Sequence, residues 1–282
     1  MPPKRLDPRE FFSTTRLVIV AGKGGVGKTT VTAVLARAAA DCGLRVLVVD
    51  LDGKPTLAEL TPGLTHLSLT APSALAEYLE THGLRRIAKR LASSGVIDVV
   101  STAAPGIDDI VVLGKLKQLE RAGEYDLIVV DGPAAGHAIT FLMAARALLD
   151  TVRGGPVHTQ AADVLELLVD PARCQVVLVT VPETTPVNEL VDTAYALEER
   201  VGIQLGPIVV NGVDEGDTLE LDGETDAVLA DAARFRNGRR ATHRRELARL
   251  DEVLALEQMR LPLLPRTGLT SADIDTLAQA IA

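Results

Sequence analysis

Nine consecutive residues near the start of the chain have the composition of a phosphate-binding loop. Residues 22–30 read GKGGVGKTT, and Gly22, Gly27, Lys28 and Thr29 fit the pattern G-x-x-x-x-G-K-[ST]. Glycines allow successive backbone N–H groups to turn toward phosphate oxygens, and a helix that begins here adds its positive end. The pattern predicts that Lys28 reaches the β- and γ-phosphates of a nucleotide and that the Thr29 hydroxyl holds Mg²⁺. The alternative is a glycine-rich turn that only joins a strand to a helix.

Carboxylates follow two further apolar runs. Residues 45–50 (RVLVVD) and 126–131 (DLIVVD) both end in aspartate, and Asp52 comes directly after the first run. The carboxyl ends of parallel strands form the edge of a sheet where ligands bind. We therefore predict that Asp131 accepts hydrogen bonds from Mg²⁺-bound water, which is the Walker B arrangement. For Asp50 two interpretations are equally consistent with the sequence. It is either a group at this ligand-binding edge or a residue that caps a helix or pairs with a lysine.

The elements that must position these groups alternate between buried strands and helices, which predicts an α/β fold with a doubly wound, mostly parallel sheet. We expect residues 1–15 to be a flexible lead-in and residues 16–282 to be a single domain, with a short helical insertion around 138–172. The predicted strands are residues 17–21, 45–50, 96–102, 126–131, 175–181, 207–211 and 260–264. The predicted helices are residues 29–41, 72–94, 138–152, 159–169, 187–200, 234–258 and 271–282.

The composition limits which kinds of protein this chain can be. The 282 residues are 47% hydrophobic but only 2% aromatic, so Ala, Val and Leu must fill the core. The formal net charge of −9 argues against a chain-wide surface for nucleic acid or anionic membrane. Cys42 and Cys174 have no neighbouring Cys or His, so we interpret both as core residues. No stretch predicts a transmembrane segment, and we expect a cytoplasmic protein.

A second lysine in the loop narrows the class of phosphate-binding-loop protein that the sequence indicates. Lys23 follows Gly22 directly, and spacing alone leaves it as a solvated surface charge. The variant loop, however, resembles the deviant Walker A loop of the signature-lysine P-loop ATPases. In that family the corresponding lysine crosses a dimer interface to the partner's nucleotide, so the resemblance implies a catalytic role for Lys23 in a nucleotide-dependent dimer. The nucleotide-binding residues it implies in the loop are Gly24, Gly25, Val26, Gly27, Lys28, Thr29 and Thr30.

Other segments resemble the ArsA/tail-anchored-protein-targeting group of these ATPases, and the resemblance runs from residue 17 to the end of the chain. Asp52 matches the water-orienting aspartate of a D-P-A-H switch I, although Gly53-Lys54-Pro55 replaces the residues that follow it. The run after Asp131 resembles switch II of the group and contains Gly136 and His137. His137 is equally consistent with a helix N-terminal residue that has no function.

Two more phrases and one predicted strand extend the resemblance to the centre and the second half of the chain. A-P-G-I-D-D at residues 104–109 resembles a P-G-x-D/E-E segment, and V-T-V-P-E-x-x-P-V-x-E at residues 179–189 has a close counterpart in the group. The strand at residues 207–211 ends in Asn211, whose counterpart reads the adenine edge with its amide. The alternative for Asn211 is a turn residue, since Asn-Gly is a common turn dipeptide.

The resemblance also indicates what this chain lacks. No cysteine falls near the C-x-x-C that joins two subunits through zinc in tail-anchored-protein-targeting members, and none lies near switch II, so we expect neither zinc nor an iron–sulfur cluster. Two cysteines cannot form a three-thiol metalloid site within one subunit. The chain has three methionines, which is few for an adaptable apolar client groove.

The function implied is Mg²⁺-dependent ATP hydrolysis in a dimer switch, with a catalytic set of Asp52, Lys23 and Lys28. The partner is a second copy or a related ATPase subunit, and the client protein or membrane component is not specified by the sequence. The alternative is a MinD/ParA-type positioning ATPase that binds membrane or DNA. The closing run SADIDTLAQAIA has no basic residue that would bind anionic lipid. The arginines of residues 234–249 are compatible with DNA binding. A solvated helix explains these arginines more simply.

Overall fold

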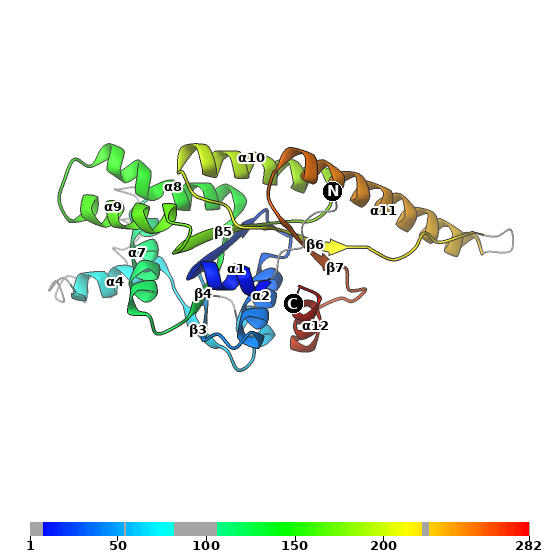
Figure 1. Ribbon diagram of the computed structural model, residues 1–282, viewed down its shortest axis with the longest axis horizontal. Coiled ribbons are helices and arrows are strands. Elements are labelled where there is room, and N and C mark those ends of the chain that lie inside the picture. Colours follow the sequence, from blue (N-terminus) through cyan, green and yellow to red (C-terminus); the bar gives the residue numbers. More distant parts are fainter. Residues whose placement is uncertain (1–7, 54, 82–105, 222–225, 282) are drawn as a thin grey trace.

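A sheet of seven strands forms the centre of the protein (Figure 1). The computed structural model describes residues 8–53, 55–81, 106–221 and 226–281. The strand order is β3-β2-β4-β1-β5-β6-β7, and every neighbouring pair is parallel. This confirms the predicted α/β class. The strands are β1 (Leu17–Gly22), β2 (Val46–Asp50), β3 (Thr65–Ser68), β4 (Leu127–Ala134), β5 (Cys174–Thr180), β6 (Ile208–Val213) and β7 (Gln258–Pro262).

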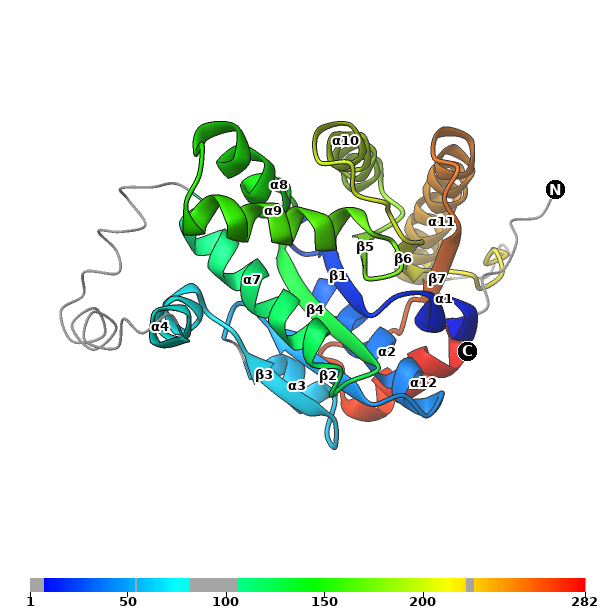
Figure 2. The same cartoon turned by 60° about the vertical axis from the view of Figure 1, so that its left-hand side comes forward.

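Helices cover both faces of the sheet. One face carries α7, α8, α9 and α10, and the other carries α2 and α12 (Figure 2). Within the described part of the chain, no helix has both the length and the apolar character that crossing a membrane requires. The helices are α1 (Pro8–Thr14), α2 (Lys28–Asp41), α3 (Thr56–Leu60), α4 (Ala71–Thr81), α7 (Ile107–Ala122), α8 (Ala135–Thr151), α9 (Pro156–Val169), α10 (Thr184–Arg200), α11 (Ala227–Val253) and α12 (Ser271–Ile281).

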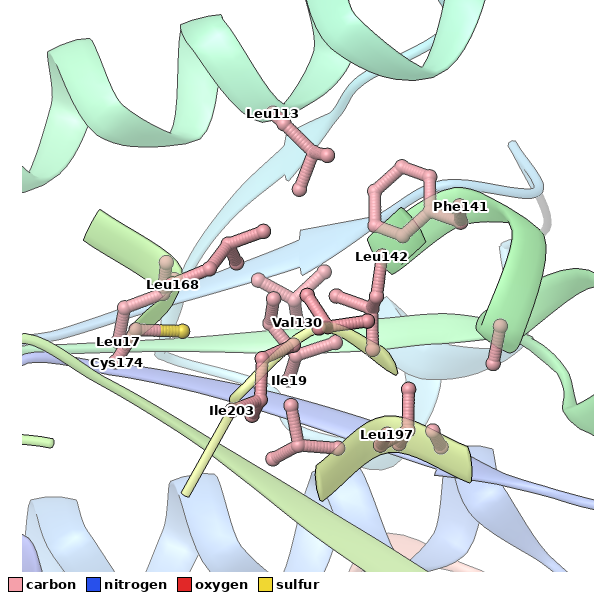
Figure 3. Close-up of a cluster of buried hydrophobic side chains, with 14 of the residues drawn as sticks. Leu17, Ile19, Leu113, Val130, Phe141, Leu142, Leu168, Cys174, Leu197 and Ile203 are labelled. Carbon is pink, nitrogen blue, oxygen red and sulfur yellow. The ribbon is translucent and has the colours of Figure 1, made fainter. Parts of the chain in front are cut away.

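The central strand shows why both faces are covered. Successive side chains of a strand point to opposite faces, and in β1 every residue is buried. Leu17 and Ile19 join the cluster under α7 to α10, where Leu142 and Leu168 pack toward the same strand (Figure 3). Val18 and Val20 join the second cluster, under α2 and α12. A strand that is apolar on both faces is stable only between two helical layers.

The start of the chain differs from the expectation of a flexible lead-in through residue 15. Residues 8–14 form α1, and the Phe11 and Phe12 side chains are buried against the layer that contains α2. The flanking prolines and charges suggested a flexible segment, but two adjacent aromatic side chains bury a large apolar area. That burial holds the segment as a helix.

Several other elements differ from their predicted bounds. α8, α9 and α10 each begin three residues before their predicted starts, β6 ends two residues later and β7 lies two residues earlier than predicted, and α11 ends at Val253 rather than at residue 258. β4 continues past Asp131 through Gly132-Pro133 to Ala134, which pairs with Gly22. The short strand β3 was not predicted, because its residues T-H-L-S are half-exposed at the sheet edge and show no apolar run. α11 begins seven residues before the predicted start, where Asp226 caps the helix by accepting hydrogen bonds from the Val228 and Leu229 N–H groups. The predicted strand at 96–102 and the predicted helix beyond residue 81 lie outside the described residues.

Candidate nucleotide site

The phosphate-binding loop lies between β1 and α2, as its sequence predicts. Gly25 and Gly27 have φ of 87° and 90°, a left-handed region that favours glycine. A Cβ atom on Gly27 would lie 2.3 Å from the Asn211 Nδ2 atom, whereas one on Gly24 or Gly25 would meet no atom within 4 Å. The loop is therefore closely packed at Gly27, where α2 begins, and at Gly22, where a Cβ atom would lie 2.4 Å from the Val179 carbonyl oxygen, and it is open at Gly24 and Gly25.

Two residues tie the loop to the rest of the domain. Val26 is buried in the layer beneath α2 and α12, so one side chain of the loop belongs to the core. The Asn211 amide donates a 2.9 Å hydrogen bond to the Val26 carbonyl, and β6 continues two residues beyond Asn211 to Val213. Asn211 thus contacts the loop itself, a role that neither the adenine nor the turn interpretation includes. Thr30 is half-buried in the first turn of α2.

Thr29 and Asp131 meet as the predicted metal site requires. The Thr29 hydroxyl donates a 2.7 Å hydrogen bond to Asp131 Oδ2, and the Thr32 hydroxyl, one turn later in α2, lies 3.3 Å from Asp131 Oδ1. Burial raises the pKa of Asp131, while the Thr29 hydrogen bond and the Lys28 charge lower it. Asp50 is the register partner of Asp131 on the adjacent strand. A hydroxyl beside carboxylates is a set of hard oxygen donors that fits Mg²⁺.

The two lysines of the loop have different surroundings. Lys28 Nζ lies 3.4 Å from the backbone carbonyl of Lys23, so its side chain lies over the loop. Lys23 Nζ lies 2.5 Å from Glu189 Oε1 on α10, and both side chains are partly exposed. The Lys23 ammonium is therefore held against α10, within its own subunit. Glu189 was not among the predicted site residues, although it closes the phrase V-T-V-P-E-x-x-P-V-x-E.

Asp52 lies on the rim of the site. It follows β2 directly, is exposed, and its backbone N–H donates a 3.0 Å hydrogen bond to Asp50 Oδ1. The Asp50 carboxylate thus shapes the turn that carries Asp52, which is an Asx-type role. The water-orienting role of Asp52 remains a prediction.

The predicted switch II residues lie at the start of α8. Gly136 and His137 are both exposed in its first turn. Burial raises the pKa of Asp109 on α7, the neighbouring Asp108 adds to the rise, and the charge of His137 opposes it. This electrostatic interaction places His137 near the N-terminus of α7. The phrase A-P-G-I-D-D contained Asp109, but its spacing alone did not connect it with His137.

Sequence comparisons agree with this geometry. The family of the CobQ/CobB/MinD/ParA nucleotide binding domain matches residues 17–226. ATPase BagA of Mycobacterium tuberculosis is 33% identical over 227 residues, which cover 71% of this chain and 66% of the relative. An arsenical pump-driving ATPase of Escherichia coli is 32% identical over 210 residues, and a putative one of Halobacterium salinarum is 28% identical over 228 residues. These two alignments cover 72% and 70% of this chain but 36% and 35% of the relatives. The chain therefore belongs to the CobQ/CobB/MinD/ParA nucleotide-binding domain family, among its ArsA-like ATPases.

Proposed function

We propose that two copies of the chain hydrolyse ATP to ADP and phosphate as a nucleotide-controlled dimer, with Lys23 of each copy acting on the nucleotide of the other. The observation that carries the proposal is the position of Lys23. It belongs to the phosphate-binding loop, yet its ammonium group is paired with Glu189 on α10 within the same subunit. An exposed pair of this kind contributes only about 0.2–1 kcal/mol, so Lys23 can exchange Glu189 for a phosphate oxygen of a partner's nucleotide.

The other residues bind and orient the nucleotide. Amide groups of the loop and the Lys28 ammonium hold phosphate oxygens, and the start of α2 adds its dipole. Asp52 orients the attacking water from the end of β2. Asn211 keeps the loop against β6 and, as the resemblance implies, lies beside the adenine. Hydrolysis then depends on positioning and charge stabilisation, as in other phosphoryl transfers.

Thr29 and Asp131 are the residues that would hold Mg²⁺, with Asp131 accepting hydrogen bonds from metal-bound water. When bound, the ion would supply positive charge that offsets the charge developing on the phosphate. The hydrogen bond between Thr29 and Asp131 holds these two oxygen donors side by side. Thr32 supports the Asp131 carboxylate from the next turn of α2.

The positions of the two cysteines oppose a thiol-based metalloid site in this subunit. Burial raises the pKa of Cys174 to about 12, so its thiol stays protonated and is a poor ligand. Cys174 lies in the cluster under α7 to α10, whereas Cys42 packs on the opposite side of the sheet. We propose that the switch acts instead on a protein client or a membrane component.

Concentration dependence of turnover tests the proposal. ATPase activity per chain should rise with protein concentration, because the active form is a dimer. Lys23→Ala should still bind ATP through Lys28 but lose at least about 10²-fold in kcat, since a cation that stabilises a phosphoryl-transfer transition state contributes about 10³–10⁵. Lys115→Ala, on the distant helix α7, is the matched control. Activity that is independent of concentration and of Lys23 would contradict the proposal.

A further inference from the structure

A projection built from α11 extends past the carboxyl end of β6 (Figure 1). We call residues 214–221 and 226–235 the outer arm, and residues 236–249 of α11 the inner segment. The Arg236 guanidinium donates two 2.9 Å hydrogen bonds to Asp214. The Asn237 amide pairs with the backbone N–H and C=O of Leu219 at 3.0 and 2.9 Å. The segment that leaves β6 is thus fastened along the helix, and the two form one ordered element.

The outer arm exposes large apolar side chains. Phe235 is 73% exposed, Val228 75% and Leu229 64%, and Leu219 and Leu221 are also exposed. These five are more than half of the nine exposed large hydrophobic residues in the described part of the chain. Singly exposed apolar residues are ordinary, but a concentration on one projecting element indicates a contact surface.

Charge divides the projection into two parts of opposite sign. Within the described residues, the outer arm has six carboxylates and one cation, and the inner segment has six cations and one carboxylate. These charges are partly neutralised within the chain, because Asp214 pairs with Arg236, Arg239 and Arg240, and Glu246 pairs with Arg245 and Arg249. Arg244 and Arg245 of the inner segment are exposed, as are Glu220 and Asp231 of the outer arm. The carboxylates of the outer arm are Asp214, Glu215, Asp217, Glu220, Asp226 and Asp231. The arginines of the inner segment are Arg236, Arg239, Arg240, Arg244, Arg245 and Arg249.

We propose that the outer arm of one subunit packs against the inner segment of α11 in a second copy of the chain. A two-fold axis across the middle of α11 makes the pairing antiparallel and reciprocal, so each acidic outer arm meets a basic inner segment. Asp226 and Asp231, on either side of Val228 and Leu229, oppose binding of this part of the arm to nucleic acid or to anionic lipid, because both carry negative charge. The partner with a complementary surface is the chain itself.

This inference rests on the dimer proposed above and names a second contact that holds it. The outer arm begins three residues after Asn211, which contacts the phosphate-binding loop, and it extends from the sheet edge that carries this loop. Two copies that face each other across this edge would therefore each direct an arm at the partner. The apolar side chains supply the burial, and the charges determine the antiparallel register.

Loss of the apolar contact gives the first test. The double variant Leu229→Asp/Phe235→Asp alters two exposed positions and should fold normally by circular dichroism. In sedimentation with Mg²⁺ and a non-hydrolysable ATP analogue, its dimer dissociation constant should rise at least tenfold. Val169→Asp, at an exposed position that ends α9, is the matched control and should dimerise as the wild type does.

A charge exchange gives the second test. One chain carries Arg244→Glu/Arg245→Glu and the other carries Glu220→Lys/Asp231→Lys. At the four substituted positions, each homodimer then brings like charges together, whereas the mixed dimer brings opposite charges together. We expect the mixture to dimerise and each variant alone to stay largely monomeric. A wild-type dimer that all these variants retain overturns this inference and leaves the proposed function standing. A wild type that remains monomeric with nucleotide overturns both.

Discussion

At the scale of single residues, Gly27 is constrained both by its backbone conformation and by a close neighbour. Its φ of 90° and its contact with Asn211 both exclude a side chain, and Asn211 in turn holds the Val26 carbonyl. Gly24 has neither constraint, because a Cβ atom there would meet nothing within 4 Å. Two glycines of one motif therefore have different physical roles.

We predict that Gly27→Ala lowers the free energy of unfolding by about 1–2 kcal/mol, the usual cost of a left-handed conformation for a residue with a Cβ atom. Displacement of Asn211 should also weaken ATP binding. Chemical denaturation of Gly27→Ala beside Gly24→Ala gives the comparison, and the Gly24 variant should lose less than half as much stability. Equal losses would show that neither the backbone conformation of Gly27 nor its contact with Asn211 limits substitution there.

The Lys23–Glu189 pair gives a second prediction at this scale. If Glu189 holds Lys23 within its own subunit, Glu189→Gln releases the lysine for the partner's nucleotide. The protein concentration for half-maximal ATPase activity should then fall by about 1.4- to fivefold, since an exposed pair contributes about 0.2–1 kcal/mol. Thermal stability should change little for the same reason.

Glu198→Gln is the matched control, because Glu198 is exposed on the same helix and lies three turns away from the site. It should leave the concentration dependence unchanged. An unchanged midpoint in Glu189→Gln would mean that the pair does not restrain Lys23.

At the scale of elements, the acidic segment after β6 depends on one carboxylate. The Arg236 hydrogen bonds lower the pKa of Asp214 to about 2. The folded-state pKa is thus below the ordinary value of about 3.9, so the contact stabilises the arm above pH 4 and is lost as the pH falls from about 4 to about 2. The Asp214–Arg236 contact is therefore intact at neutral pH.

We predict that Asp214→Asn releases residues 214–221 from α11 at neutral pH. Hydrogen bonds to charged groups contribute about 1.5–3 kcal/mol, so amide hydrogen exchange in this segment should be roughly tenfold faster or more. Exchange in β1 should not change. In the wild type the same acceleration should appear only as the pH approaches 2, after correction for the intrinsic exchange rate. A wild-type segment that is released at pH 5 would contradict this assignment.

Elements with a continuous apolar run could be predicted from the sequence, whereas elements without such a run could not. β1, β2 and β5 are buried on both faces, so their runs of Val and Leu indicated strands within one residue of the observed bounds. β3 is a half-exposed edge strand of four residues and has no such signal. α1 is held by the burial of Phe11 and Phe12 against another layer, a tertiary effect that local pattern does not contain.

At the scale of the whole molecule, the site forms because the sheet brings distant segments to one edge. The phosphate-binding loop, Asp50 and Asp131 follow three adjacent strands, so the order β2-β4-β1 places them together. The motifs predicted this part of the site. The contacts of Lys23 with Glu189 and of Asn211 with Val26 span 166 and 185 residues, and no spacing rule connects residues so far apart.

The same scale explains why we propose that Lys23 acts on a partner's nucleotide. Lys28 lies over the phosphate-binding loop, whereas Lys23 is directed toward Glu189 on α10. A second chain that faces the loop brings its own Lys23 to the nucleotide and closes the site from the other side. The central claim is therefore that Lys23 acts between subunits.

Mixing two inactive variants measures this directly. Lys28→Ala should not bind ATP but still presents Lys23, while Lys23→Ala binds ATP but lacks the lysine that acts on its partner. Each alone should hydrolyse ATP at least about 10²-fold more slowly than the wild type, in line with the contribution of such cations. If Lys23 acts between subunits, an equimolar mixture regains a substantial part of the wild-type rate, because each mixed dimer contains one complete site. A mixture no faster than the sum of its two components would contradict the account.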